Sequence, residues 1–376
     1  VINSAADVGV TAANRETILS LALQSGQGGS IGVNGTMSYA DVDSVTVAGV
    51  SDRASINAGR LLVDASEDLF VWSVAGAVTM SDQMSVGVSV AVQDLDTDTR
   101  AFIGKVGSQA GSAGTFTLDQ LDVQARSQGM AGAVAVAGAV AKSKSAQQEQ
   151  EEEQRRRNNP SFIDKLKTKA DGKVTALEDL ADNALGEKAE ALADMFDDAH
   201  ATLETSGGGN KQQMAKPSYG LAVSGSGTVN LVNQSTVASV EGALVTARNN
   251  KVGLDVAALN DTLLMGISGA GALTMANADN SSGSAAVAGA VAFADIGNVT
   301  TAQVIDSQVD KAGEVSVLAQ SDSEQINVGL GLAVNASGDQ TTANSAAGSV
   351  TIGRAGNKTA AKLVNSRIDG TGSDVS

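Results

Sequence analysis

Large apolar residues and small residues alternate along several stretches of this chain. From Val86 to Val92 every second residue is valine, and the residues between are Gly, Ser or Ala. The stretch from Ile326 to Val334 alternates in the same way. A period of two indicates a strand with one buried face. Because valine is the larger apolar residue, we expect Val88 to face the interior and Ser89 to face outward.

A short phrase, Val-x-Ala, recurs ahead of these long strand-like segments. Its copies are centred on Val10, Val63, Val123, Val245 and Val317, and the interval from Val123 to Val245 is much longer than the others. A unit of several short strands that recurs at intervals and cannot close a core alone is typical of a stacked solenoid. The sequence therefore predicts an all-β fold, a parallel β-helix (β-solenoid) of about five units, with the third unit lengthened by an insertion.

Residues 144–216 differ from the rest of the chain. They include a block of charge from Gln147 to Arg157, followed by capping boxes at Ser161 and Thr175 that indicate helix starts. Apolar residues then recur near helical spacing, at Leu177, Leu180, Ala184, Leu192, Met195, Ala199 and Leu203. We therefore predict a charged helical insertion at 144–216, between a first solenoid part at 1–143 and a second at 217–376.

A fixed order of motifs runs through the units outside the insertion. One example begins with the strand Thr301–Ile305, continues through a Ser-x-Val turn at Ser307, and reaches Val315–Ala319 and the alternating run from Ile326. This order resembles the repeats of very large secreted bacterial surface proteins, the filamentous-haemagglutinin-like and leukotoxin-like β-helical adhesins. The resemblance implies a parallel β-helix that is exported across a Gram-negative outer membrane and is extracellular, at the outer cell surface.

Composition narrows the function classes. The chain has 376 residues, with 42 Gly, 2 Pro and 2% aromatic residues, which suits thin layers of small residues better than the core of a globular enzyme. Its net charge is −17, and an acidic surface argues against nucleic acid or anionic lipid as a partner. No apolar run is long enough for a membrane span. The lack of Cys fits either a reducing compartment or export of an unfolded chain.

Candidate chemistry is sparse. Asp94, Asp96 and Asp98 place three carboxylates at alternate positions, a spacing that fits either a calcium site or a structural turn. The single His, His200, lies in the charged insertion, where a solvated side chain is the ordinary interpretation. The single Trp, Trp72, fits core packing, a partly buried belt or an exposed ligand platform. We assign no catalytic residue and no cofactor-binding residue.

These observations favour a non-enzymatic structural segment, a stalk or filament of a secreted bacterial surface protein that acts in adhesion or extracellular matrix formation. Two alternatives stay open: a glycan-active β-helix enzyme, and a toxin or passenger segment whose helical insertion binds a partner. Neither end of the sequence shows the capping element that a solenoid needs. We therefore expect flanking repeats of the same chain or end-to-end self-association, with a glycan or cell-surface receptor as a further partner.

Overall fold

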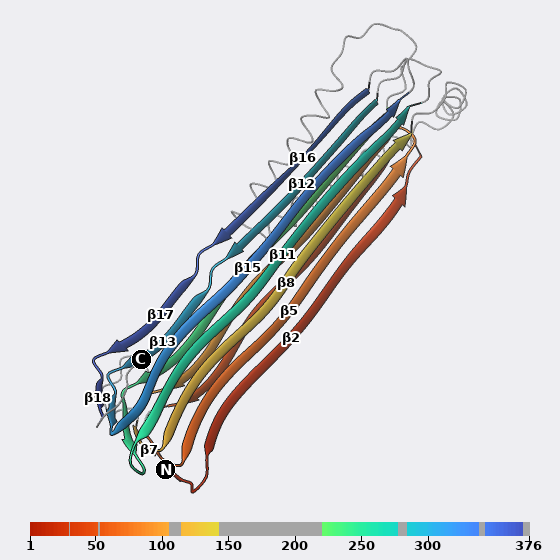
Figure 1. The fold of residues 1–376 in the computed structure, drawn as a ribbon. Helices are drawn as coiled ribbons and strands as arrows, with labels where there is room; N and C mark the ends of the chain where they lie inside the picture. The colour runs from red at the N-terminus through yellow and green to blue at the C-terminus, as the bar shows by residue number, and fades with distance from the viewer. Residues whose placement is uncertain are drawn as a thin grey trace.

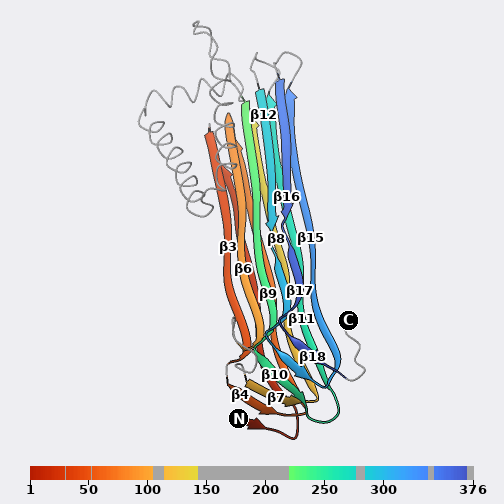
Figure 2. The ribbon, with the colours of Figure 1, turned by 90° about the vertical axis from the view of Figure 1, so that its left-hand side faces the viewer.

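The computed structural model describes residues 1–29, 31–51, 53–104, 114–142, 220–276, 284–337 and 343–370. Within these ranges all regular structure is β-strand, arranged in three parallel sheets (Figures 1 and 2). For these residues the prediction of an all-β fold is confirmed, and the stacked parallel sheets are consistent with a β-solenoid. The predicted helical insertion at 144–216 lies outside the described residues.

Two of the sheets are long and face each other, while the third is short and lies at one end of them. The outbound sheet contains β2 (Val8–Gln27), β5 (Arg60–Ser81), β8 (Gln120–Lys142), β11 (Val252–Ala276) and β15 (Ala312–Ser337). The return sheet contains β3 (Ile31–Val50), β6 (Met84–Ile103), β9 (Gly220–Glu241), β12 (Ser284–Ile296), β13 (Val299–Ile305), β16 (Ala343–Ala355) and β17 (Lys358–Val364). The base sheet contains β1 (Ile2–Asn3), β4 (Ala54–Asn57), β7 (Gly114–Leu118), β10 (Ala243–Ala247), β14 (Gln308–Asp310) and β18 (Arg367–Asp369).

The chain visits the three sheets in the same order on every turn. A short base strand leads into an outbound strand that runs away from the base, and a return strand brings the chain back (Figure 1). Neighbouring strands in a sheet therefore come from successive turns. Because β8 pairs with β5 and β11, and β9 pairs with β6 and β12, these two strands belong to the same turn. Residues 143–219 connect them.

The repeated Val-x-Ala phrase forms a ladder across the outbound sheet. The paired residues of this ladder are Val10, Val63, Val123, Val256 and Val317. The predicted copy at Val245 was therefore wrong. Val245 lies in the base sheet opposite Phe116, because its segment precedes the outbound strand of that turn. The residues Val245 to Ala247 match the Val-x-Ala phrase, but the phrase alone does not indicate which of the three sheets a segment joins.

The corner between the return and base sheets has a left-handed residue on successive turns. Gly104 and Gly242 have φ of 85° and 68°, and Asp306 and Asn365 each have φ of 49°. Gly adopts this conformation without steric cost, and Asp and Asn tolerate it better than other residues. The left-handed conformation at this corner therefore favours Gly, Asp and Asn, a preference that the period-two pattern of the strands does not reveal.

The interior is widest beside the base sheet, where three sheets meet. Large apolar side chains from all three form one buried cluster, in which Phe116, Leu61 and Leu121 are fully buried. Burial of side chains of this size contributes about 1.5–3 kcal/mol each before the entropy of ordering is counted. This cluster is the main apolar core of the molecule.

Away from the base the two long sheets approach each other closely; we call this part the tip half. A Cβ added at Gly87 would lie 2.5 Å from the backbone oxygen of Gly138 on the facing sheet. The hydroxyls of Ser226 and Ser268 meet across the gap at 2.7 Å. Most inward side chains of the tip half are accordingly Ala, Gly, Ser or Thr, and the large apolar ones, such as Leu69 and Leu264, lie toward the base.

The close approach reverses the predicted orientation of the alternating runs. Ser89 points inward, is fully buried and accepts a hydrogen bond from the Thr36 hydroxyl at 3.3 Å. Val88 points outward and is half-buried. The prediction that Val88 faces the interior was therefore wrong. The gap admits the smaller of the two alternating residue types, so the larger type lies on the outward side of the sheet.

A polar layer crosses the interior between the main core and the tip half. Glu67 is 3% exposed and accepts hydrogen bonds from the hydroxyls of Ser44, at 2.6 Å, and Thr99, at 2.7 Å. On a later turn the Asn260 amide donates to Gln234 at 2.8 Å. A buried polar group is costly unless it is hydrogen-bonded. A strand that slipped by one residue would break these bonds, so the layer helps to fix the register.

Candidate interaction surface

The outer face of the outbound sheet changes character halfway along its strands. Near the base it carries ion pairs between neighbouring turns, such as Arg126 with Asp64 at 2.7 Å and Arg15 with Asp68 at 2.9 Å. Beyond Asp68 the outward positions of β5 are all apolar or Gly, from Phe70 to Met80. One strand therefore carries a polar half and an apolar half on the same side of the sheet.

We call the apolar half of this surface the apolar face. It consists of the outward residues from Leu19 to Leu23 on β2, Phe70 to Met80 on β5, Met130 to Val140 on β8, Leu263 to Met275 on β11, and Ile326 to Val334 on β15. Leu332 on an edge strand is 64% exposed, and Val136 on the central strand is still 49% exposed. A contiguous apolar patch of several hundred Å² on a protein surface marks an interaction site.

Glycines on the apolar face make room for neighbouring side chains. Trp72 lies across Gly132, where an added Cβ would overlap the indole ring. Phe70 stacks with Trp72 at a centroid distance of 6.4 Å and an interplanar angle of 12°. Leu23 covers Gly76 in the same manner. Trp72 therefore lies half-buried on the outer surface, outside the core, and the side chains around it are closely packed.

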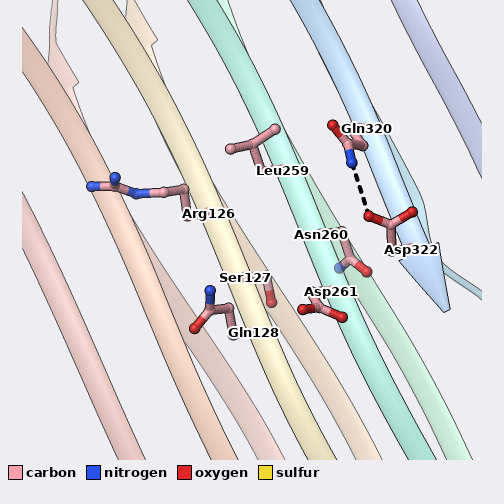
Figure 3. Close-up of a pocket in the computed structure, with 8 residues that line it drawn as sticks. All are labelled: Arg126, Ser127, Gln128, Leu259, Asn260, Asp261, Gln320 and Asp322. Atoms are coloured by element: carbon pink, nitrogen blue, oxygen red, sulfur yellow. Dashed lines mark hydrogen bonds between the residues drawn. The ribbon is translucent and has the colours of Figure 1, made fainter. Parts of the chain in front are cut away.

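A row of polar residues borders the apolar face on its base side. The row contains Arg15, Asp68, Gln128, Asp261 and Asp322, one from each outbound strand and in register. A groove of about 200 Å³ lies along this row (Figure 3). The Gln320 amide donates to Asp322 at 2.8 Å, and Arg126 pairs with Asp64. These side chains bind one another and do not converge on a common point, so we assign no ligand to the groove.

The predicted calcium ligands lie on the return sheet. Asp94, Asp96 and Asp98 share the outward side of β6. Successive carboxylates on an extended strand are about 7 Å apart, whereas calcium binds oxygens at about 2.3–2.6 Å. Asp98 also accepts a hydrogen bond from Arg100 at 2.7 Å. Among the described residues, no group of three or more acids or histidines is arranged to hold a metal, and calcium binding stays a prediction.

Tyr39 lies beside two of the acids on this surface. Burial raises the pKa of its phenol, and the charges of Asp41 and Asp94 raise it further. The direction follows because ionisation would place a phenolate in a partly desolvated position next to carboxylates. Asp41 also accepts a hydrogen bond from the neutral phenol, which favours the protonated form.

We expect Asp41→Asn to lower the pKa of Tyr39 toward its ordinary value. Absorbance at 295 nm during alkaline titration would report the ionisation, and because the chain has 2 Tyr, Tyr39→Phe identifies the relevant midpoint. Asp43→Asn serves as the control, since Asp43 does not contribute to the shift. Equal displacement by Asp41→Asn and Asp43→Asn would contradict the assignment to Asp41.

The described part of the chain contains no helix long and apolar enough to cross a membrane. His200 and the predicted helical segments lie outside that part. A site that depends on them is neither supported nor contradicted by the geometry.

The stack of strands is open on both sides. Within the described residues, β2 pairs only with β5 and β3 only with β6. At the opposite side, β15 pairs only with β11 and β16 only with β12. The outer edges therefore present backbone N–H and C=O groups that another strand can pair with. Ala347, which continues the inward row of Ala288, is exposed, and no further strand of the described part covers it.

The apolar face was absent from the sequence-based predictions, although its signal is present. In Leu19–Leu23 the residues between the leucines are Ser and Ala, and in Leu330–Val334 they are Gly and Ala. When one of two alternating sets is small on turn after turn, that set can face a narrow gap, and the large set must face outward.

No protein-family model matches the chain, and no match is found among curated proteins or solved structures. The resemblance to secreted adhesin repeats therefore rests on the sequence motifs, and the function that it implies is a proposal.

Proposed function

We propose that this chain is a β-solenoid stalk or filament segment of a secreted bacterial surface protein, non-enzymatic, and acting at the outer cell surface in adhesion or matrix formation. The observation that supports the proposal is the open stack. Each turn adds a parallel layer to all three sheets, with the return strand of the last two turns divided into two pieces, and within the described residues the outermost long strands have unpaired edges. Further turns, from flanking repeats or from another copy, can extend such an array without a change of geometry.

The distribution of charge supports a stacking role for the polar residues. Arg126 of one turn pairs with Asp64 of the previous turn, and Arg15 with Asp68 of the next. The Gln124 amide likewise donates to Asp255 of the following turn, at 3.5 Å. Pairs of this kind stabilise the correct alignment of neighbouring strands, and a strand that slipped would bring like charges together. Acidic residues distributed in this way stabilise contacts between turns, and they are not gathered at one point as a reaction centre would require.

Substitution at the open edge tests the proposal. The unsubstituted chain should form end-to-end rods that lengthen with concentration, as followed by sedimentation velocity and negative-stain electron microscopy. Ala347→Lys should abolish them, because a lysine in the inward row would occupy the space of the next turn and bury a charge there. Ala346→Lys, on the outward side of the same exposed strand, should leave rod formation unchanged.

Rods that form equally with both lysine variants, or a chain that remains single at every concentration, would contradict end-to-end stacking. Incubation with acidic polysaccharides addresses the enzyme alternative. Release of new reducing or unsaturated ends in proportion to protein concentration would overturn the non-enzymatic assignment.

A further inference from the structure

We propose that the apolar face of the outbound sheet binds the same face of a second copy of this chain, with the two sets of strands antiparallel. This association is side by side, whereas the stacking described above joins strand edges. It does not depend on the proposed function, because it rests on the outward side chains of a single sheet.

The size of the apolar face fits a dimer interface. Five strands spaced about 4.8 Å apart, with apolar stretches from about 15 Å long on β2 to about 40 Å long on β11, cover on the order of 800 Å². A stable protein–protein interface buries about 800 Å² on each partner. Val136 lies at the centre, on the middle strand of the five, and is 49% exposed. Burial of such residues against the same face of a second copy would form a second dry layer, as in sheet-on-sheet packing.

The polar row on the border sets the orientation. Asp68, Asp261 and Asp322 share this row with a single cation, Arg15. Two copies with parallel strands would bring these acidic rows together, which is unfavourable. A two-fold axis that lies in the plane of the interface, perpendicular to the strands, overlaps the tip halves and directs the acidic base halves to opposite sides. Such an interface is isologous and closes at two copies.

A lipid bilayer is a poorer occupant of the apolar face. The face is flanked by the outer edges of β2 and β15, where the described chain leaves backbone groups unpaired. Each unpaired group costs several kcal/mol in hydrocarbon. A second copy covers the side chains and leaves those edges in water. The net charge of −17 also opposes approach to anionic lipid.

The return sheet is a weaker candidate for the same role. Its outward residues Val90, Val92, Val229 and Leu231 already form a buried cluster with exposures of 7%, 0%, 7% and 5%. The outbound sheet keeps exposed apolar residues on each of its five strands, from Leu19 through Val136 to Leu332. The uncovered apolar area therefore lies mainly on the outbound sheet.

The test uses the full chain with Ala347→Lys, so that stacking along the edge is blocked. Sedimentation equilibrium should show a monomer–dimer equilibrium in this background. Val136→Glu should weaken dimerisation at least about tenfold. Thr11→Glu, which adds the same charge to an exposed position on the polar half of β2, outside the polar row, should have no such effect. Leu332→Glu provides a second disruption on another strand, and circular dichroism confirms that each variant is folded.

Trp72 provides a readout specific to this face, because it is the single Trp of the chain. Its emission should shift to longer wavelength on dilution as the face is uncovered, and should be concentration-independent in Val136→Glu. A chain that stays monomeric, that dimerises equally with Val136→Glu and Thr11→Glu, or that floats with phosphatidylcholine vesicles would overturn the proposal. None of these results affects the comparison of Ala346→Lys with Ala347→Lys, which tests stacking along the strand edges. The stacking proposal and the dimer proposal can therefore fail separately.

Discussion

Ser89→Asp should destabilise the chain by several kcal/mol, whereas Val88→Asp should cost only about 1–2 kcal/mol. Ser89 is fully buried in the narrow gap between the long sheets, with the Thr36 hydroxyl at 3.3 Å as its partner. A carboxylate there would lose its water and gain no cation. Val88 faces outward and is half-buried, so an aspartate in its place keeps access to solvent. Urea unfolding followed by Trp72 fluorescence and circular dichroism measures the difference.

Ser89→Ala is the control for the hydroxyl itself. It removes one hydrogen bond without adding volume or charge, and should cost about 1 kcal/mol. A larger loss from Val88→Asp than from Ser89→Asp would mean that the valines face the interior, as the residue types alone suggested, and would contradict the strand register of the tip half.

The sequence predicted strands and stacking well because both depend on local repetition. The alternation from Val86 to Val92 identifies a strand, and the recurrence at Val10, Val63, Val123 and Val317 aligns successive turns. Neither observation reports the distance between the two long sheets. That distance decides which of the two alternating sets can face inward, and it results from packing over many turns.

The same limit explains why the apolar face was not predicted. Val88 was assigned to the interior by size, because apolar residues are usually buried, so a surface formed by large residues such as Val136 was not expected. In this molecule small residues such as Ala135 and Ala137 fill the gap instead. The buried carboxylate of Glu67 was likewise not foreseen, because its partners Ser44 and Thr99 come from the return strands of two successive turns. Only the assembled stack brings them together.

Phe116→Ala should cost about 3–5 kcal/mol, in the range observed for large-to-small changes in well-packed cores. Phe116 is fully buried at the widest part of the interior, beside the base sheet. It is paired with Ile56 on the previous turn and Val245 on the next. Removal of the ring would leave a cavity lined by side chains of all three sheets. The surrounding strands are held by their ladders and can collapse only partly into that space.

Phe102→Ala is the matched control, since Phe102 points outward from β6 and lies over Gly49. Its truncation removes the same atoms but leaves a space open to solvent, so we expect about 1 kcal/mol. Phe116→Leu should recover most of the loss, because it refills the cavity with apolar volume. Hydrogen exchange would locate the effect, and protection should fall first in β4, β7 and β10. Equal losses from Phe102→Ala and Phe116→Ala would show that the base cluster is no more important to stability than the surface, and that the tip half can hold the stack by itself.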